Sequence, residues 1–113
     1  MTNEKFIKNY LKALSSRIIP DKETIKKIIN IKNILTKAKK NNSNVLIFGN
    51  GGSAAIASHV SLDLVKNTKI KAVNFNEAAL LTCFSNDYGY EKWIEKAIDF
   101  YANKDDIVML ISS

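Results

Sequence analysis

Apolar residues recur at helical spacing through the first third of the chain. This periodicity predicts an amphipathic helix over residues 3–16 and a longer, isoleucine-rich helix over residues 22–40. Asp21 comes directly before the second helix and is a natural N-cap for it. The polar run of residues 41–44 ends the second helix. The apolar stripe of the first helix consists of Phe6, Tyr10, Leu11 and Leu14.

After residue 44 the pattern changes to short apolar runs that alternate with helical segments. Continuous apolar runs bounded by turn residues are typical of strands buried in a parallel sheet. The predicted strands are residues 45–48, 70–75 and 107–111, and the predicted helices are residues 53–66, 77–85 and 91–101. This alternation implies right-handed crossovers. We therefore expect an α/β fold, a three-layer, doubly wound parallel sheet of the flavodoxin-like class, preceded by two helices.

We expect residues 1–41 to form an N-terminal helical pair and residues 42–113 to form a single structural unit. The last predicted strand ends at Ile111 and has five consecutive apolar residues. Such a strand needs cover on both faces and a neighbour at its edge. We therefore expect these residues to be the N-terminal part of a longer fold, truncated after the third strand.

The composition is that of one globular domain: 113 residues, 46% hydrophobic and 25% charged, with a mean hydropathy of −0.12. No apolar run is long enough for a membrane span or a signal peptide, so we expect a cytoplasmic protein with no membrane partner. The single cysteine, Cys83, excludes an internal disulfide and is expected in the core. The net charge of +6 is spread over lysines, with Arg17 the only arginine, so nucleic acid is not an expected partner.

Gly49-Asn50-Gly51-Gly52-Ser53 lies between the first predicted strand and the helix that follows it. This is the carboxyl end of the sheet, where open α/β folds bind their ligands. Glycines let backbone N–H groups approach a ligand, and a helix N-terminus favours an anion such as phosphate. The segment matches neither the dinucleotide-binding fingerprint nor a P-loop. A tight turn with no ligand is the alternative interpretation.

Three segments, in this order, resemble the sugar isomerase (SIS) domain family and, within it, the phosphoheptose isomerases. They are Gly49-Asn50-Gly51-Gly52-Ser53-Ala54-Ala55 with His59 downstream, Ser85-Asn86-Asp87-Tyr88-Gly89-Tyr90-Glu91, and Asp106-Ile107-Val108-Met109-Leu110-Ile111-Ser112-Ser113. The resemblance implies an aldose–ketose isomerase that interconverts sedoheptulose 7-phosphate and a heptose 7-phosphate through an enediol. It also implies a homotetramer and zinc as a cofactor.

The resemblance also implies roles for individual residues. His59 and Asp63 would bind the metal and carry out catalysis, with Asp63 at the position where the family has a glutamate. The remaining residues of the family's site, a second histidine and a glutamine, have no counterpart in these 113 residues, so the zinc ligand set is incomplete. The implied substrate-binding residues are Asn50, Gly51, Gly52, Ser53, Asn86, Asp87, Ser112 and Ser113.

Residues four apart share one helix face, so His59 and Asp63 can converge on one small site. Moving a proton between adjacent carbons needs a base, an acid and stabilisation of the enediolate, which suits a carboxylate and an imidazole. The alternative is a hydrogen-bonded histidine beside the core and a surface aspartate. Aspartate is about 1.5 Å shorter than glutamate, which puts catalysis in doubt and leaves binding possible.

Three functional hypotheses remain open from the sequence. The first is a phosphoheptose isomerase-like enzyme, of which the 113-residue chain alone is inactive because part of the family's site is missing. The second is a non-catalytic module of the same fold that binds a sugar phosphate. The third, more remote, is a basic nucleic-acid module, whose affinity would fall steeply with salt.

Overall fold

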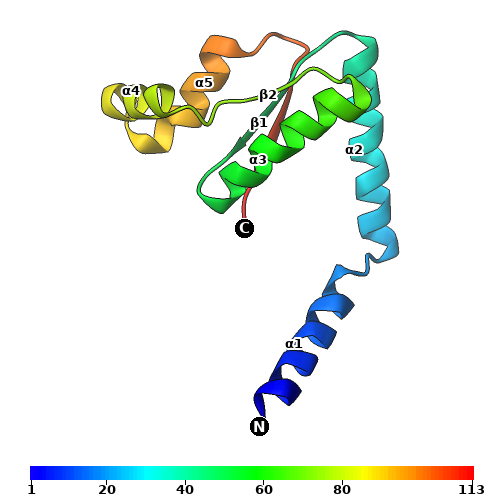
Figure 1. The fold of residues 1–113 in the computed structure, drawn as a ribbon. Coiled ribbons are helices and arrows are strands. Elements are labelled where there is room, and N and C mark those ends of the chain that lie inside the picture. The colour runs from blue at the N-terminus through cyan, green and yellow to red at the C-terminus, as the bar shows by residue number, and fades with distance from the viewer. The chain divides into compact units, whose positions relative to one another are not determined.

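The computed structural model describes residues 1–113 as a series of helices and three strands (Figure 1). By contacts the chain divides into two compact units, Met1–Asn33 and Ile34–Ser113. No helix in the structure combines the length and the apolar character needed to cross a membrane. In chain order the elements are α1 (Asn3–Ile18), α2 (Lys22–Lys40), β1 (Val45–Gly49), α3 (Gly52–Asp63), η1 (Leu64–Thr68), β2 (Ala72–Asn74), α4 (Ala78–Tyr88), η2 (Tyr90–Lys92), α5 (Trp93–Tyr101) and β3 (Ile107–Ile111).

The first unit contains α1 and most of α2. The carboxylate of Asp21 accepts a hydrogen bond from the Thr24 N–H at 2.7 Å, which confirms Asp21 as the cap of α2. The same hydrogen bond lowers the pKa of Asp21 below its ordinary value. Within this unit the apolar stripes of both helices are exposed to solvent. Their exposed members are Phe6, Ile7, Tyr10, Leu11, Leu14, Ile18, Ile25, Ile28, Ile29 and Ile31.

The second unit is built on a parallel sheet in the order β2-β1-β3, so the predicted doubly wound architecture is confirmed. β1 is central and all of its residues are buried. One face of the sheet packs against α3 and the end of α2, through Ala38 and Ala57. The other face packs against α4 and α5, where Phe48 stacks on Phe75 with ring centroids 5.1 Å apart. These are the three layers visible in Figure 1.

β2 is shorter than the predicted strand over residues 70–75. Before it, the chain leaves η1 through Lys69, whose φ of 59° is left-handed, and the Ile70 N–H still bonds to the Leu64 carbonyl. After it, the Asn76 N–H bonds to the side chain of Asn74 and turns the chain away. Local hydrogen bonds to turn residues therefore replace sheet pairing at both ends of the apolar run.

Asp106 joins the starts of β1 and β3. Its carboxylate accepts hydrogen bonds from the backbone N–H groups of Asn44 and Asn103, both at 2.8 Å, and from their side-chain amides at 3.3 Å. Partial burial alone would raise the pKa of Asp106, but the hydrogen bonds outweigh it and hold the pKa below its ordinary value. This network sets the register that brings the carboxyl ends of the two strands side by side.

Candidate active site

The glycine loop, residues 49–53, turns the chain directly from β1 into α3. The Asn50 carbonyl accepts hydrogen bonds from the N–H groups of Ser53 at 3.0 Å and Ala54 at 3.3 Å. Gly51 has a φ of 55° and serves as the N-cap of α3, so the helix begins at Gly52, one residue before the predicted start at residue 53. A residue with a side chain would be strained at Gly51.

A cleft of about 390 Å³ opens beside this loop at the carboxyl ends of β1 and β3. It brings Asn50 and Ser53 of the glycine loop next to Ser112 and Ser113, which follow β3. The three serine hydroxyls, the Asn50 amide and the N-terminus of α3 can together bind an anionic, hydroxyl-rich ligand. The full lining is Phe48, Gly49, Asn50, Ser53, Ile94, Leu110, Ile111, Ser112 and Ser113.

Asn50 also contacts Trp93, a core residue of α5. Trp93 is buried, with 2% of its surface exposed, as expected for an apolar helical face. Its indole Nε1–H donates a hydrogen bond to Asn50 Oδ1 at 3.2 Å, across 43 positions of sequence. The only signal in the sequence was the type of residue, since a buried indole N–H needs an acceptor.

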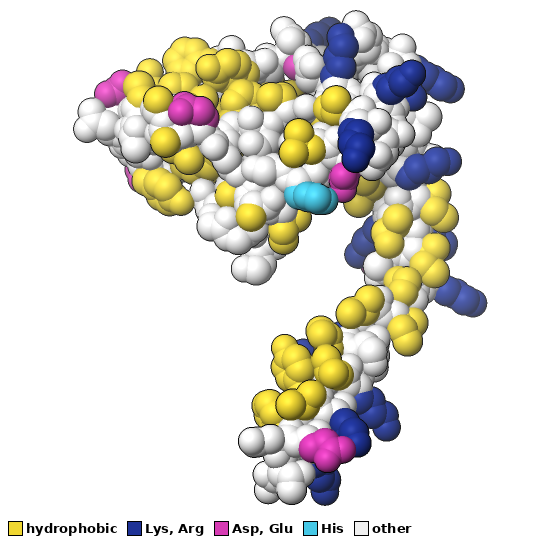
Figure 2. All heavy atoms as spheres, viewed as in Figure 1, with side chains coloured by type: hydrophobic (Ala, Val, Ile, Leu, Met, Phe, Trp, Pro, Cys, Tyr) yellow, Lys and Arg dark blue, Asp and Glu magenta, His cyan; other side chains and the backbone are white.

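His59 and Asp63 lie on one face of α3, with His59 Nε2 3.2 Å from Asp63 Oδ2. Their side chains are 78% and 53% exposed, and Figure 2 shows the imidazole, the only histidine, at the surface. Neither residue lines the cleft. Asp63 is the last residue of α3, roughly 16 Å along the helix axis from Gly52. The pair is thus an exposed acid–imidazole couple some distance along the helix from the glycine loop.

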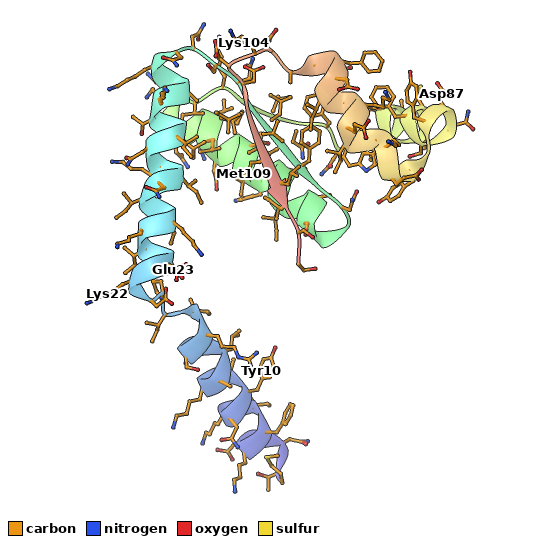
Figure 3. The ribbon with its side chains drawn as sticks, turned by 180° about the vertical axis from the view of Figure 1, so that it is seen from behind. Tyr10, Lys22, Glu23, Asp87, Lys104 and Met109 are labelled. Atoms are coloured by element: carbon orange, nitrogen blue, oxygen red, sulfur yellow. The ribbon has the colours of Figure 1, made fainter.

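Asn86 and Asp87 lie in the last turn of α4 and are exposed. The Asn86 amide donates to Asp87 Oδ1 at 3.3 Å, and neither residue reaches the cleft. Figure 3 shows Asp87 at the outer end of α4, well away from Met109 in β3. Cys83, one turn earlier, is exposed with its Sγ 3.6 Å from Asp87 Oδ2. The prediction that Cys83 lies in the core was wrong, because the face of α4 that carries Cys83 is turned towards solvent. Desolvation and the Asp87 carboxylate raise the pKa of the Cys83 thiol.

His59 and Asp63 provide donor atoms of the types that zinc prefers. Zinc in proteins takes at least three protein ligands. No group of three or more histidine, cysteine, aspartate or glutamate side chains comes together in the structure. Because these residues supply two donors, they do not fit a zinc ion by themselves.

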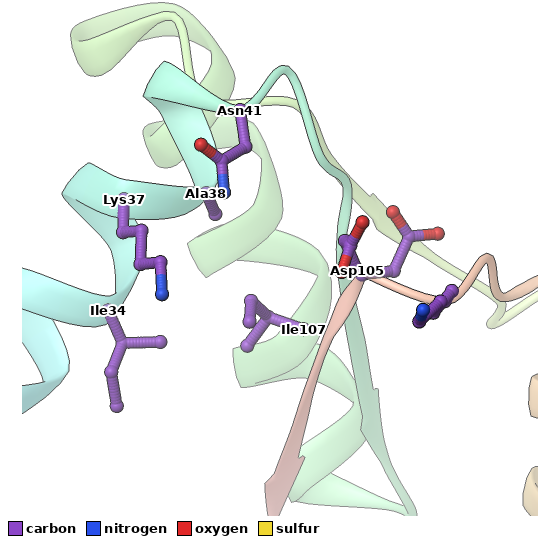
Figure 4. A pocket seen from close by; sticks show the side chains of 8 residues that line it. Ile34, Lys37, Ala38, Asn41, Asp105 and Ile107 are labelled. Carbon is purple, nitrogen blue, oxygen red and sulfur yellow. The ribbon is translucent and has the colours of Figure 1, made fainter.

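A second hollow, of about 370 Å³, lies at the opposite end of the sheet (Figure 4). It is bounded by the end of α2 and the start of β3, with Lys37 and Asp105 at its rim. None of the predicted site residues lines it. Because open α/β sheets bind ligands at the carboxyl ends of their strands, the cleft beside the glycine loop is the candidate active site.

Comparison with known proteins identifies the family. The chain matches the SIS domain family over residues 6–113. It is 35% identical over 98 residues to the phosphoheptose isomerase of Thermodesulfovibrio yellowstonii. The aligned region covers 81% of this chain and 49% of that protein. It is 33% identical over 92 residues to that of Aquifex aeolicus, covering 76% and 48%. The chain therefore spans about half the length of the curated relatives it matches.

Solved structures show the same fold. The phosphoheptose isomerase of Neisseria gonorrhoeae superimposes with a TM-score of 0.83 at 22% identity, over 97% of this chain and 60% of the other. That of Francisella tularensis gives 0.80 at 24% identity, over 100% and 63%. At such identities the superpositions establish the three-layer architecture, and the sequence match establishes the family. This chain belongs to the SIS domain family.

Proposed function

We propose that the protein is a sugar-phosphate isomerase that interconverts sedoheptulose 7-phosphate and a heptose 7-phosphate through an enediol. The observation that carries the proposal is the cleft beside the glycine loop, where Asn50, Ser53, Ser112 and Ser113 converge at the N-terminus of α3. Relatives that share this sequence pattern are named phosphoheptose isomerases. A phosphorylated sugar matches the hydroxyl, amide and helix N-terminal groups of the cleft.

In this proposal the glycine loop forms the floor of the binding site. A Cβ atom at Gly51 or Gly52 would meet no atom within 4 Å, so the space beside both residues is open to a ligand. The hydroxyls of Ser112 and Ser113 would bind the phosphate together with the first turn of α3. Asn86 and Asp87 lie in α4 and do not line this cleft, so their assignment to the sugar hydroxyls rests on the resemblance alone.

The proposed proton transfer uses the pair on α3. Asp63, as general base, takes the proton from the carbon next to the carbonyl, while His59, as acid, gives a proton to the carbonyl oxygen. The enediol forms, and the protonated Asp63 then returns its proton to the adjacent carbon while His59 takes the proton of the other enediol hydroxyl, which becomes the new carbonyl. In an extended heptose 7-phosphate the reacting carbons lie roughly 7 Å from the phosphate-bearing carbon. Separate groups for phosphate and for proton transfer are therefore what this reaction requires.

A non-catalytic sugar-phosphate-binding module is the second candidate. The observation that favours it is Asp63 itself. Its carboxylate is about 1.5 Å closer to the helix than a glutamate carboxylate would be. A misplacement of roughly 1 Å can lower a rate on the order of a hundredfold, while binding through the cleft is unaffected.

Incubation with sedoheptulose 7-phosphate, followed by product analysis, tests the proposal. We expect the full-length protein to form the heptose 7-phosphate. The 113-residue chain alone should show no appreciable turnover. It contains a single carboxylate–imidazole pair, and the other acid–base residues that the family resemblance implies are not part of it. Binding of the sugar phosphate by the full-length protein without turnover would select the binding module. If the full-length protein neither binds nor turns over the sugar phosphate, both candidates are rejected. Turnover by the 113-residue chain at an ordinary enzyme rate would contradict the expectation that this chain alone is inactive.

We also propose a homo-oligomer, a tetramer by resemblance to the family. The apolar stripe of α1 is exposed, including Tyr10 at 60% and Leu11 at 55%, and stripes of this kind favour helix packing between subunits. Light scattering on dilute protein should give a multiple of the chain mass. Leu11→Gln should shift the protein towards monomer, whereas the adjacent Lys12→Gln, as a matched control, should not. A compact monomer at micromolar concentration would contradict the proposal.

A further inference from the structure

Trp93 has one polar atom, and that atom contacts the glycine loop. The indole packs edge-on against Phe48, with ring centroids 5.9 Å apart, and it is almost fully buried. Its Nε1–H reaches Asn50 Oδ1 at 3.2 Å. Asn50 itself is exposed and lines the cleft. A core residue of α5 is thus connected directly to a residue of the candidate site.

The chemistry of the indole fixes which way the Asn50 amide faces. An indole nitrogen only donates a hydrogen bond, so the amide atom that it meets must be the oxygen. Because Oδ1 faces the indole, the amide nitrogen of Asn50 points the other way, and its two hydrogens are available to other partners. No hydrogen bond from this nitrogen to a protein atom is present in the structure. Asn50 therefore turns its two amide N–H donors towards the cleft, while its oxygen faces the indole.

The backbone of Asn50 is fixed at the same time. Its carbonyl accepts from the N–H groups of Ser53 and Ala54, which anchors the main chain to the first turn of α3. Main chain and side chain are thus held by independent hydrogen bonds. Without the indole, the amide could rotate by half a turn and present its oxygen instead, since the two ends of the group have nearly the same shape.

We infer that Trp93 is a positioning residue that sets Asn50 as a hydrogen-bond donor to an oxygen of the bound sugar phosphate. The inference rests on the proposed function for the identity of the ligand, and on the indole–amide contact for the orientation. A site organised in this way favours ligands with an acceptor oxygen at this position. It disfavours those that present only a donor, because the donor would meet the amide hydrogens.

A spectroscopic experiment on the full-length protein tests the orientation without any ligand. The indole N–H resonance of Trp93 should be protected from solvent exchange in the unaltered protein. Asn50→Ala should accelerate its exchange at least tenfold, while Asn50→Asp, which keeps an acceptor, should preserve protection. Ser53→Ala, a neighbour in the same loop, is the control and should leave the resonance unchanged. Exchange that is equally slow in Asn50→Ala would overturn the inference, and this comparison does not require Trp93→Phe to fold.

Calorimetric titration with sedoheptulose 7-phosphate tests the consequence for binding. Trp93→Phe keeps the aromatic ring but removes the donor, and we expect roughly tenfold weaker binding. In an Asn50→Ala background the same change should have no further effect, because its influence passes through Asn50. Additive losses in the double variant, or unchanged affinity of Trp93→Phe, would overturn the inference. If the unaltered protein binds no sugar phosphate while Asn50→Ala still exposes the indole, the proposed function fails and the orientation of Asn50 stands.

Discussion

Asp63→Asn is expected to lower turnover of sedoheptulose 7-phosphate by the full-length protein by about 10²- to 10⁴-fold. The amide has the size of the carboxylate but cannot accept a proton from carbon. Asp63 is exposed and contacts His59 on the same helix face, so the substitution removes no core packing. We expect the affinity for the sugar phosphate to change little, because binding is assigned to the cleft beside the glycine loop. Steady-state rates and calorimetric titration measure the two effects separately.

Asp99→Asn is the matched control for Asp63→Asn. Asp99 is also an exposed aspartate near a helix end, 56% exposed and paired with Lys96 at 3.4 Å. Its loss should leave the rate unchanged. Asp63→Glu extends the carboxylate by about 1.5 Å, and we expect turnover at least equal to that of the unaltered protein. An ordinary rate in Asp63→Asn, or an equal fall in Asp99→Asn, would rule out Asp63 as the base.

The fold could be predicted because strand and helix periodicities are strong where burial is complete. The apolar run from Val45 to Phe48 is buried throughout and forms the central strand, and residues 107–111 pair with it in parallel. The predicted second strand included Ile70 and Phe75, which lie outside β2. Both side chains are buried, but neither residue pairs with β1. Apolar character indicated burial there, and local turn hydrogen bonds decided the pairing. The hydrophobic pattern does not indicate whether turn hydrogen bonds or sheet pairing will satisfy the backbone at these positions.

The sequence indicated where the glycine loop lies in the fold, but not which side chains contact it. The rule that ligands bind beyond the carboxyl ends of strands placed Asn50 at this edge of the sheet, and the family resemblance implied Ser112; the two residues share a cleft. Helical spacing likewise placed His59 beside Asp63. The bond from Trp93 to Asn50 could not be predicted, because it joins residues on different elements whose relative position depends on the packing of α5 on the sheet. Cys83 was misplaced for the same reason.

Gly49→Ala is expected to destabilise the sheet unit by about 3 kcal/mol, the upper part of the usual range for overpacking. A Cβ at this position would lie 2.5 Å from the backbone carbon and oxygen of Ser53 and 2.9 Å from the Ala54 nitrogen. These atoms belong to the first turn of α3 and cannot yield as a side chain would. The whole helix start would have to move away from β1. Denaturant unfolding followed by Trp93 fluorescence measures the loss.

Gly52→Ala separates this steric effect from a general effect of losing a glycine. Gly52 is the first residue of α3, its φ is not left-handed, and an added Cβ would meet no atom within 4 Å. Alanine favours a helix over glycine by up to about 1 kcal/mol, so this variant should be as stable as the unaltered protein or more so. The two substitutions add the same methyl group to one loop, and only Gly49→Ala should lower the stability of the unit. Equal destabilisation by both would mean that the close approach of β1 to α3 does not determine the requirement for glycine at position 49.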